Sequence, residues 1–223
     1  MQPYKAIFFD FDYTLGDATD CIVAGFRYAF ARLGLPEPEY EAVRYTIGMT
    51  LENAYTLLSA DGKPAHQAEF RRLYVEKANP LQVKGTKLFP GAVDLLNQLK
   101  ASGVTVAIVS TKRSSVIEEI LAYQGLSDRV SFVVGGSDVA HPKPAPDAAL
   151  LALEKAGLKR SEALFVGDTV IDAETAQRSG LDFAAVCNGT TPKEAFSRWP
   201  HVFVANNLPA LNDWLNTQNS EKP

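Results

Sequence analysis

The chain has 223 residues, of which 46% are hydrophobic and 22% charged, values typical of a globular protein able to bury a core. A net charge of −4 and a pI near 5.4 argue against binding to nucleic acid or to anionic membranes. Two distant cysteines, Cys21 and Cys187, offer neither a disulfide framework nor a zinc spacing, and no apolar run reaches the roughly 18 residues of a membrane span. We therefore expect a cytoplasmic protein without a signal segment.

The first predicted element is a short strand at residues 6–9, which runs directly into Asp10 and Asp12. A continuous run of β-branched and aromatic residues is typical of a strand buried on both faces of a parallel sheet. Such sheets bind ligands beyond the carboxyl ends of their strands. Two acids at this spacing can bind a hard cation, attack an electrophile or move a proton, although Asp is also common in turns.

The segment from residue 16 to residue 86 has helical periodicity and no convincing strand. Helical spacing recurs over residues 22–33, Thr50 is expected to cap a second helix, and a third helix is expected to end near Pro80. A connection of this length far exceeds the usual loop of about 4–6 residues. We therefore predict a small all-helical domain at residues 16–86, inserted into an α/β core at residues 1–15 and 87–223.

From residue 90 onward, predicted strands and helices alternate. The predicted strands are residues 104–109, 131–134, 163–166 and 183–186, the last of these closing the sheet. Ser115 and Glu118 are expected to form a capping box, a further helix is expected to begin near Thr191, and Leu208, Leu211 and Leu215 indicate a terminal helix. The alternation predicts an α/β fold with a Rossmann-like parallel sheet and right-handed crossovers.

Polar residues follow the predicted strands at several points. In chain order they are Asp10 and Asp12, Ser110 and Thr111, Lys143, and Asp168 and Asp172. Because the carboxyl ends of parallel strands share one edge of a sheet, we expect these residues to converge there. Three carboxylates near one point repel each other unless a cation separates them, and small oxygen-only sites suit Mg²⁺. Lys143 and the hydroxyl groups could then hold a phosphoryl group, whose transfer depends mainly on positioning and charge neutralisation.

Each of these residues also has an ordinary structural interpretation. Ser110 and Thr111 could form a turn or a helix cap, and Lys143 could be a solvated loop lysine. Asp172 could simply cap a helix through a capping box with Thr169. The segment 187–191 is most simply a loop leading into a helix cap. The interpretation as a site therefore depends on the complete set.

The complete set resembles a known family. The ordered series Asp10-x-Asp12-x-Thr14, Ser110, Lys143 and Gly167-Asp168-x-x-x-Asp172 resembles the four motifs of the haloacid dehalogenase superfamily of phosphohydrolases. The helical insert after the first motif is similar to the cap of the phosphoglycolate phosphatase-like branch. The resemblance implies an Mg²⁺-dependent phosphatase that acts on a small phosphorylated metabolite, such as phosphoglycolate, through an aspartyl-phosphate.

The resemblance also implies a role for each residue. Asp10 would be the nucleophile, and Asp12 would protonate the leaving group and then activate water. Mg²⁺ would bind Asp10, Asp168 and the backbone carbonyl of Asp12. Ser110, Thr111 and Lys143 would hold the phosphoryl oxygens. Asp172 would orient the residues that bind the metal and the phosphoryl group, without binding either itself. Thr14 would stabilise the turn around Asp12.

Other functions are compatible with the same residues. A sugar-phosphate mutase resembling β-phosphoglucomutase would use the same groups, but such mutases usually carry a histidine shortly after the first motif, where we find none. An inorganic pyrophosphatase and a non-catalytic binding protein on the same fold also remain open. Family members usually have Gly where this chain has Tyr13, which weakens any transfer of substrate identity.

Overall fold

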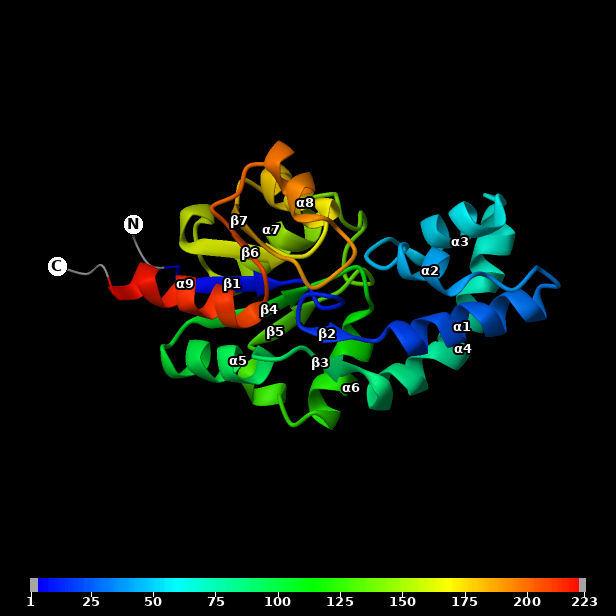
Figure 1. Ribbon diagram of the computed structural model, residues 1–223, viewed down its shortest axis with the longest axis horizontal. Helices are drawn as coiled ribbons and strands as arrows, with labels where there is room; N and C mark the ends of the chain where they lie inside the picture. Colours follow the sequence, from blue (N-terminus) through cyan, green and yellow to red (C-terminus); the bar gives the residue numbers. More distant parts are fainter. Residues whose placement is uncertain (1–3, 221–223) are drawn as a thin grey trace. The chain divides into compact units, whose positions relative to one another are not determined.

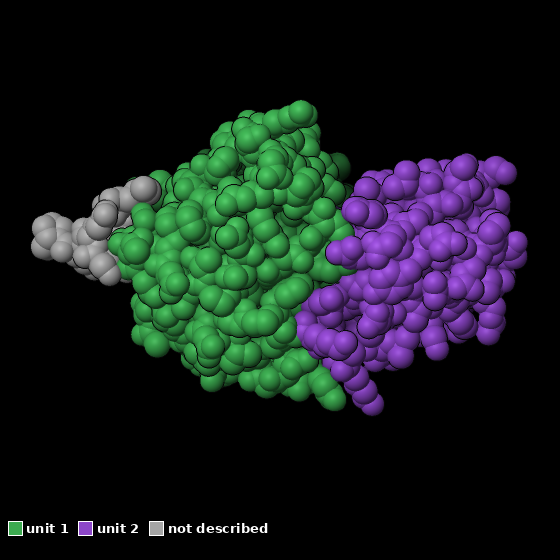
Figure 2. Space-filling view, viewed as in Figure 1, with its two compact units in different colours: residues 1–16, 88–223 green, residues 17–87 purple. Residues whose placement is uncertain are grey.

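The computed structural model describes residues 4–220, and the chain divides into two compact units. Unit 1 contains the described residues up to Gly16 and from Leu88 onward, and unit 2 is Asp17–Lys87 (Figure 2). None of the helices within residues 4–220 is long and apolar enough to cross a membrane. Every residue of the predicted site lies in unit 1.

Unit 1 is built around a parallel six-stranded sheet with the strand order β5-β4-β1-β6-β7-β8. The strands are β1 (Ala6–Phe9), β4 (Thr105–Val109), β5 (Phe132–Val134), β6 (Ala163–Gly167), β7 (Asp182–Val186) and β8 (Phe203–Ala205). Helices α7 (Asp147–Ala156) and α8 (Val170–Ser179) cover one face of the sheet, and α5 (Ala92–Ala101) and α6 (Ser114–Tyr123) cover the other (Figure 1). The predicted α/β fold with a parallel sheet is confirmed.

Strand β1 lies inside the sheet, between β4 and β6, and all four of its residues are buried. The chain builds the sheet outward from β1 through β4 to β5, and then returns to place β6 on the other side of β1. A parallel sheet opens a crevice where its strand order reverses in this way, beyond the carboxyl ends of the strands. The residues that follow β1 and β6 therefore meet at that crevice.

Two predictions about the strands are wrong. The sheet does not close at residues 183–186, because β8 pairs with β7 beyond them. Strand β8 has only three residues, two of them half-buried, so it lacks the long apolar run that identified the other strands. In addition, β2 (Gly16–Asp17) and β3 (Lys87–Leu88) form a separate two-stranded sheet where the chain passes from one unit to the other, although no strand was expected after Gly16.

The remaining helical segments of unit 1 differ in part from the prediction. They are η1 (Ser127–Arg129), η2 (Arg160–Glu162), η3 (Lys193–Arg198) and α9 (Leu208–Ser220), the first three being 3₁₀ helices. The terminal helix is confirmed, with Leu208, Leu211 and Leu215 buried. The predicted capping box at Ser115 is wrong, because α6 already begins at Ser114, whose hydroxyl donates to Asp138 instead of capping the helix.

Unit 2 is all-helical. Its helices are α1 (Thr19–Arg32), α2 (Tyr40–Arg44), α3 (Leu51–Ser59) and α4 (Pro64–Gly85), and an aromatic cluster of Phe26, Phe30, Tyr55, Phe70 and Tyr74 forms its core. Thr50 caps α3 as predicted, accepting a hydrogen bond from the backbone N–H of Asn53.

The predicted end of the third helix at Pro80 is wrong, because α4 continues to Gly85. Proline removes one backbone donor from a helix, but tertiary packing supplies most of the stability of helices in proteins. Ala78 and Gln82, on either side of Pro80, are both buried, and α4 packs along α1. This packing offsets the lost hydrogen bond.

Candidate active site

The sheet fixes the backbone position of the site residues that lie at strand ends. The backbone N–H of Asp10 donates to the carbonyl of Val166 at 2.8 Å, so Asp10 stays on the strand ladder at the end of β1. The backbone N–H of Ser110 likewise donates to the carbonyl of Val134 at 3.0 Å, at the end of β4. Asp168 directly follows β6. The backbone positions of these three residues are fixed because each lies at the end of a strand of the sheet.

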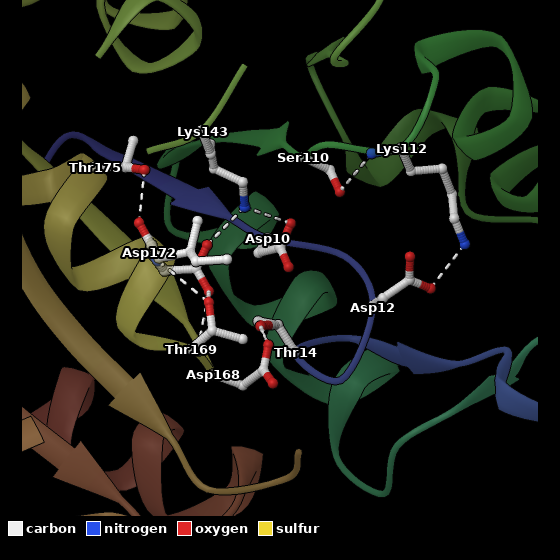
Figure 3. A network of polar contacts seen from close by, with 11 residues as sticks. Asp10, Asp12, Thr14, Ser110, Lys112, Lys143, Asp168, Thr169, Asp172 and Thr175 are labelled. Atoms are coloured by element: carbon white, nitrogen blue, oxygen red, sulfur yellow. Dashed lines mark hydrogen bonds and ion pairs between the residues drawn. The ribbon is translucent and has the colours of Figure 1, made fainter. Parts of the chain in front are cut away.

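Lys143 reaches the carboxylates from the loop between β5 and α7. Its Nζ lies 2.8 Å from Oδ1 of Asp10 and 2.6 Å from Oδ1 of Asp172, and its side chain is only 2% exposed (Figure 3). Burial acts to lower the pKa of the Lys143 ammonium, but the two carboxylates outweigh burial and raise it. Lys143 is therefore charged, and it is a buried cation rather than a solvated loop lysine.

The carboxylates around Lys143 carry more negative charge than its ammonium balances. Burial, reinforced by the charge of Asp172, raises the pKa of Asp10 to about 6, although Lys143 opposes the shift. Burial and the charges of Asp172 and Asp10 raise the pKa of Asp168 well above its ordinary value. The ionised forms of these acids are therefore costly without a further positive charge.

The oxygens of Asp172 are already engaged. Oδ1 accepts a hydrogen bond from Lys143, while Oδ2 accepts from the backbone N–H of Thr169 at 3.0 Å and from its hydroxyl at 2.6 Å. Thr169 and Asp172 form the capping box at the start of α8, as predicted. Gly167 makes room for this carboxylate, because a Cβ at position 167 would lie 2.4 Å from atoms of Asp172.

The cluster of acids has the composition of a cation site. Carboxylate oxygens of Asp10, Asp168 and Asp172 lie within 4.8 Å of one another, and of the three acids Asp172 is the one with both oxygens already engaged. Oδ2 of Asp168 is buried and has no hydrogen-bond partner among the described residues, an expensive arrangement unless another group contacts it. A buried, oxygen-only, negatively charged set is the environment that Mg²⁺ and similar hard cations prefer.

The loop after β7 closes over Asp168. A Cβ at Gly189 would lie 2.0 Å from Oδ2 of Asp168, so only glycine lets the backbone pass there. The side chain of Asn188 donates to the carbonyl of Thr14 at 3.2 Å, and the Thr14 hydroxyl donates to Oδ1 of Asp168 at 3.2 Å. The interpretation of residues 187–191 as a simple loop into a helix cap does not include this contact. The available signal was the asparagine–glycine pair that begins two residues beyond the end of β7.

Asp12 lies apart from the three clustered carboxylates. Its Oδ1 accepts a hydrogen bond from Nζ of Lys112 at 2.7 Å, on the side of Figure 3 away from Asp168 and Asp172. The Phe11 carbonyl accepts from the N–H groups of residues 14, 15 and 16, which folds the chain into a tight turn just after Asp12. Tyr13 occupies this turn with a left-handed φ of 58° and is buried. This turn fixes the position of the Asp12 backbone after the end of β1.

Ser110 and Thr111 begin the loop after β4. Ser110 is buried, and its Oγ accepts a hydrogen bond from the backbone N–H of Lys112 at 3.3 Å. Thr111 is half-buried. The ordinary turn role considered for Ser110 is therefore present, and it also shapes the segment that carries Lys112. The sequence gives Lys112 no predictable role, because a lysine three residues beyond the end of a strand shows no sign of which acid it will meet.

Comparison with known proteins identifies the same pattern. The model of the haloacid dehalogenase-like hydrolase family matches residues 7–186. The chain is 33% identical over 204 residues to "Probable phosphatase IndB" of Dickeya dadantii, covering 89% of this chain and 88% of that protein. It is 30% identical over 229 residues to a phosphoglycolate phosphatase of Yersinia pestis, covering 96% and 99%.

Solved structures agree with the sequence relatives. A crystal structure of a protein from Bacteroides fragilis, assigned to the haloacid dehalogenase-like hydrolases, has 33% sequence identity and superposes with a TM-score of 0.90, covering 93% of this chain and 99% of that one. The structural match therefore extends over nearly the whole of both chains.

Proposed function

This chain belongs to the haloacid dehalogenase-like hydrolase family, and on that premise we propose that it is an Mg²⁺-dependent phosphatase that uses Asp10 as its nucleophile. The observation that carries the proposal is the position of Asp10. It lies at the switch point of the sheet, 2.8 Å from the buried ammonium of Lys143 and beside two further carboxylates. An anionic phosphoryl group placed there would meet a nucleophile, a cation and a metal site together.

The reaction follows from the two acids of the first motif. The Asp10 carboxylate attacks phosphorus, and the bond from phosphorus to the leaving oxygen breaks as Asp12 donates a proton to that oxygen. Asp12 then takes a proton from a water molecule as the water attacks the phosphorus of the aspartyl-phosphate. Phosphate leaves, and the Asp10 carboxylate is restored. The separation of Asp12 from the clustered acids supports this division of roles.

Lys143 and the loop after β4 account for phosphoryl binding. The Lys143 ammonium would balance charge on the phosphoryl oxygens while it keeps its hydrogen bond to Asp172. Ser110 and Thr111, at the end of β4, would donate hydrogen bonds to the same oxygens. The Ser110 hydroxyl accepts from Lys112, so its own proton can point toward a ligand.

Magnesium would be held by Asp10, Asp168 and the backbone carbonyl of Asp12, with Asp172 and Thr14 orienting the groups around it. The orphaned Oδ2 of Asp168 and the engagement of both Asp172 oxygens support this assignment of ligands. When bound, Mg²⁺ would neutralise charge that develops on the phosphoryl group.

For the substrate, we propose a small phosphomonoester of the phosphoglycolate type. The support is the 30% identity to a phosphoglycolate phosphatase over nearly the whole length of both chains. Unit 2 would serve as the cap that selects the substrate, by its likeness to the family's helical insert. Its helical fold and separate core support its being a domain of its own.

Phosphate release from a panel of substrates tests this function. The panel contains phosphoglycolate, sugar monophosphates, nucleoside monophosphates and pyrophosphate, each with Mg²⁺ and with a chelator. We expect one strongly preferred monoester, loss of turnover with chelator, and no turnover by the Asp10→Asn variant. Release that is independent of metal, or substantial activity of Asp10→Asn, would contradict the proposal. Interconversion of sugar monophosphates without release would identify a mutase instead.

A further inference from the structure

Lys112 forms an ion pair that the proposed mechanism does not use. Its Nζ lies 2.7 Å from Oδ1 of Asp12, and the two side chains are only 9% and 11% exposed. An exposed ion pair contributes little, but a pair shielded from water in this way interacts more strongly. The Lys112 ammonium also lies over the ring of Phe11, 5.4 Å from its centre. Lys112 thus bridges two consecutive residues of the first motif.

The backbone of Lys112 is fixed on both sides. Its N–H donates to Oγ of Ser110 at 3.3 Å, and its carbonyl accepts from the N–H of Gly136 at 3.1 Å. A Cβ at Gly136 would lie 2.5 Å from the carbonyl oxygen of Thr111, so the segment after β5 packs directly against the loop that carries Lys112. The lysine side chain therefore starts from a rigid position, and it can hold a partner in place.

We propose that Lys112 is a positioning residue that orients the Asp12 carboxyl group, so that its protonated oxygen can donate to the leaving group. This inference rests on the proposed function. A free aspartate side chain can rotate, and proton transfer requires the carboxyl group within hydrogen-bond reach of the leaving oxygen. The hydrogen bond to Oδ1 holds one oxygen of Asp12 and leaves the other available. Lys112 acts through Asp12, whereas Lys143 serves the nucleophile.

The test compares Lys112→Met, Lys112→Arg and Lys5→Met. Methionine keeps the length of the buried stem without the charge, and arginine keeps the charge. Lys5 is the matched control, because it forms a 2.7 Å ion pair with Glu162 in the same unit but has a 65% exposed side chain. Each variant is assayed in single turnovers with an alkyl phosphate that the enzyme hydrolyses and with p-nitrophenyl phosphate, whose phenolate leaves without needing a proton.

We expect Lys112→Met to slow cleavage of the alkyl phosphate about 10- to 100-fold, the range for loss of a charged hydrogen bond, with little change for p-nitrophenyl phosphate. Lys112→Arg should recover most of the rate, and Lys5→Met should match the wild type. Equal losses on both substrates would overturn the proposal, since they would indicate phosphoryl binding or general destabilisation. An unchanged rate on the alkyl phosphate would also overturn it.

A double-mutant cycle provides the second measurement. If Lys112 acts through Asp12, Lys112→Met costs nothing further once Asp12 is asparagine, and the two effects are strongly non-additive. Additive losses would contradict the proposal. The experiment also separates this inference from the proposed function. Failure of the wild type to hydrolyse any phosphate would refute the function, whereas an active wild type with a fully active Lys112→Met would refute the positioning role alone.

Discussion

The hydroxyl of Thr14 donates a hydrogen bond to Oδ1 of Asp168 at 3.2 Å, which joins the turn after β1 to the end of β6. The two residues are 154 positions apart in sequence and both are buried. The bond engages Oδ1 of Asp168, whereas Oδ2 lies against Gly189 and has no hydrogen-bond partner among the described residues. Thr14 therefore helps to fix the orientation of the Asp168 carboxylate.

Replacing Thr14 with valine keeps its shape and removes this donor. We expect Thr14→Val to weaken Mg²⁺ binding about 10-fold or more, the usual effect of losing a partner that orients a metal ligand. Calorimetric titration with Mg²⁺ measures the dissociation constant directly. Thr105→Val is the control, because Thr105 is the first residue of β4 and lies at the end of that strand away from the site. Equal Mg²⁺ affinity in Thr14→Val and in the control would show that Asp168 needs no such orientation.

Removing the Lys143 ammonium should reduce both activity and stability. Lys143→Met would leave Asp10 and Asp172 buried without their shared cation, and breaking a buried pair in this way costs about 3–5 kcal/mol. Urea denaturation of the metal-free protein at neutral pH measures the change in the free energy of unfolding. Lys100→Met removes an exposed pair with Asp128 and should change it little. Comparable small effects of the two substitutions would contradict the buried network.

The raised pKa of Asp10 predicts a pH dependence of stability in the metal-free protein. The folded protein binds this proton more tightly than the unfolded chain, whose carboxyl has a pKa near 3.8. The stabilising contribution is therefore complete below that pH and is lost as the pH rises through about 6. We expect the stability of the wild type to fall by about 2 kcal/mol relative to Asp10→Asn between about pH 4 and pH 7.

Chemical denaturation at several pH values, with chelator present, measures this difference. A stability difference that stays constant, or that moves in favour of the wild type with rising pH, would show that Asp10 does not have a raised pKa. Adding Mg²⁺ should stabilise the wild type more at pH 7 than at pH 4, because the metal requires ionised carboxylates.

Gly189 is the position where a small substitution should have the largest local effect. An added Cβ would lie 2.0 Å from Oδ2 of Asp168, so Gly189→Ala must displace either the loop or the carboxylate. Overpacking of this kind costs about 1–3 kcal/mol, and we expect weaker Mg²⁺ binding together with a lower Tm. Gly62→Ala is the control, because its Cβ would meet atoms only at 3.6 Å and beyond. A Gly189→Ala variant with wild-type Mg²⁺ affinity would contradict the close approach.

The sequence was most informative where local chemistry and strand position coincide. The buried run of β1 ending at Asp10, and the glycine–aspartate ending of β6, were sufficient to predict two acids at one edge of the sheet. Helix caps at Thr50 and Thr169 were predictable because capping depends on a few adjacent residues. The structure also brings Lys143 to the acids, and its position between a predicted strand and the following helix had already led us to expect it at this edge of the sheet.

Features set by long-range packing were not predictable. Strand β8 is too short to show periodicity and exists because β7 offers an edge to pair with. Helix α4 passes through Pro80 because its neighbours on α1 stabilise it. The contacts of Lys112 with Asp12 and of Gly189 with Asp168 join residues 100 and 21 positions apart, and no spacing rule connects them.

The most direct test of the account is to trap the phosphorylated enzyme. The wild type is mixed with its preferred substrate and Mg²⁺, quenched within the first turnover, and reduced with borohydride, which converts an acyl phosphate of aspartate to homoserine. Mass spectrometry of the peptide containing residues 6–15 then locates the modified residue. The account predicts homoserine at position 10 and unmodified Asp12. Turnover without modification at position 10, or modification at another carboxylate, would contradict the assignment of Asp10 as the nucleophile.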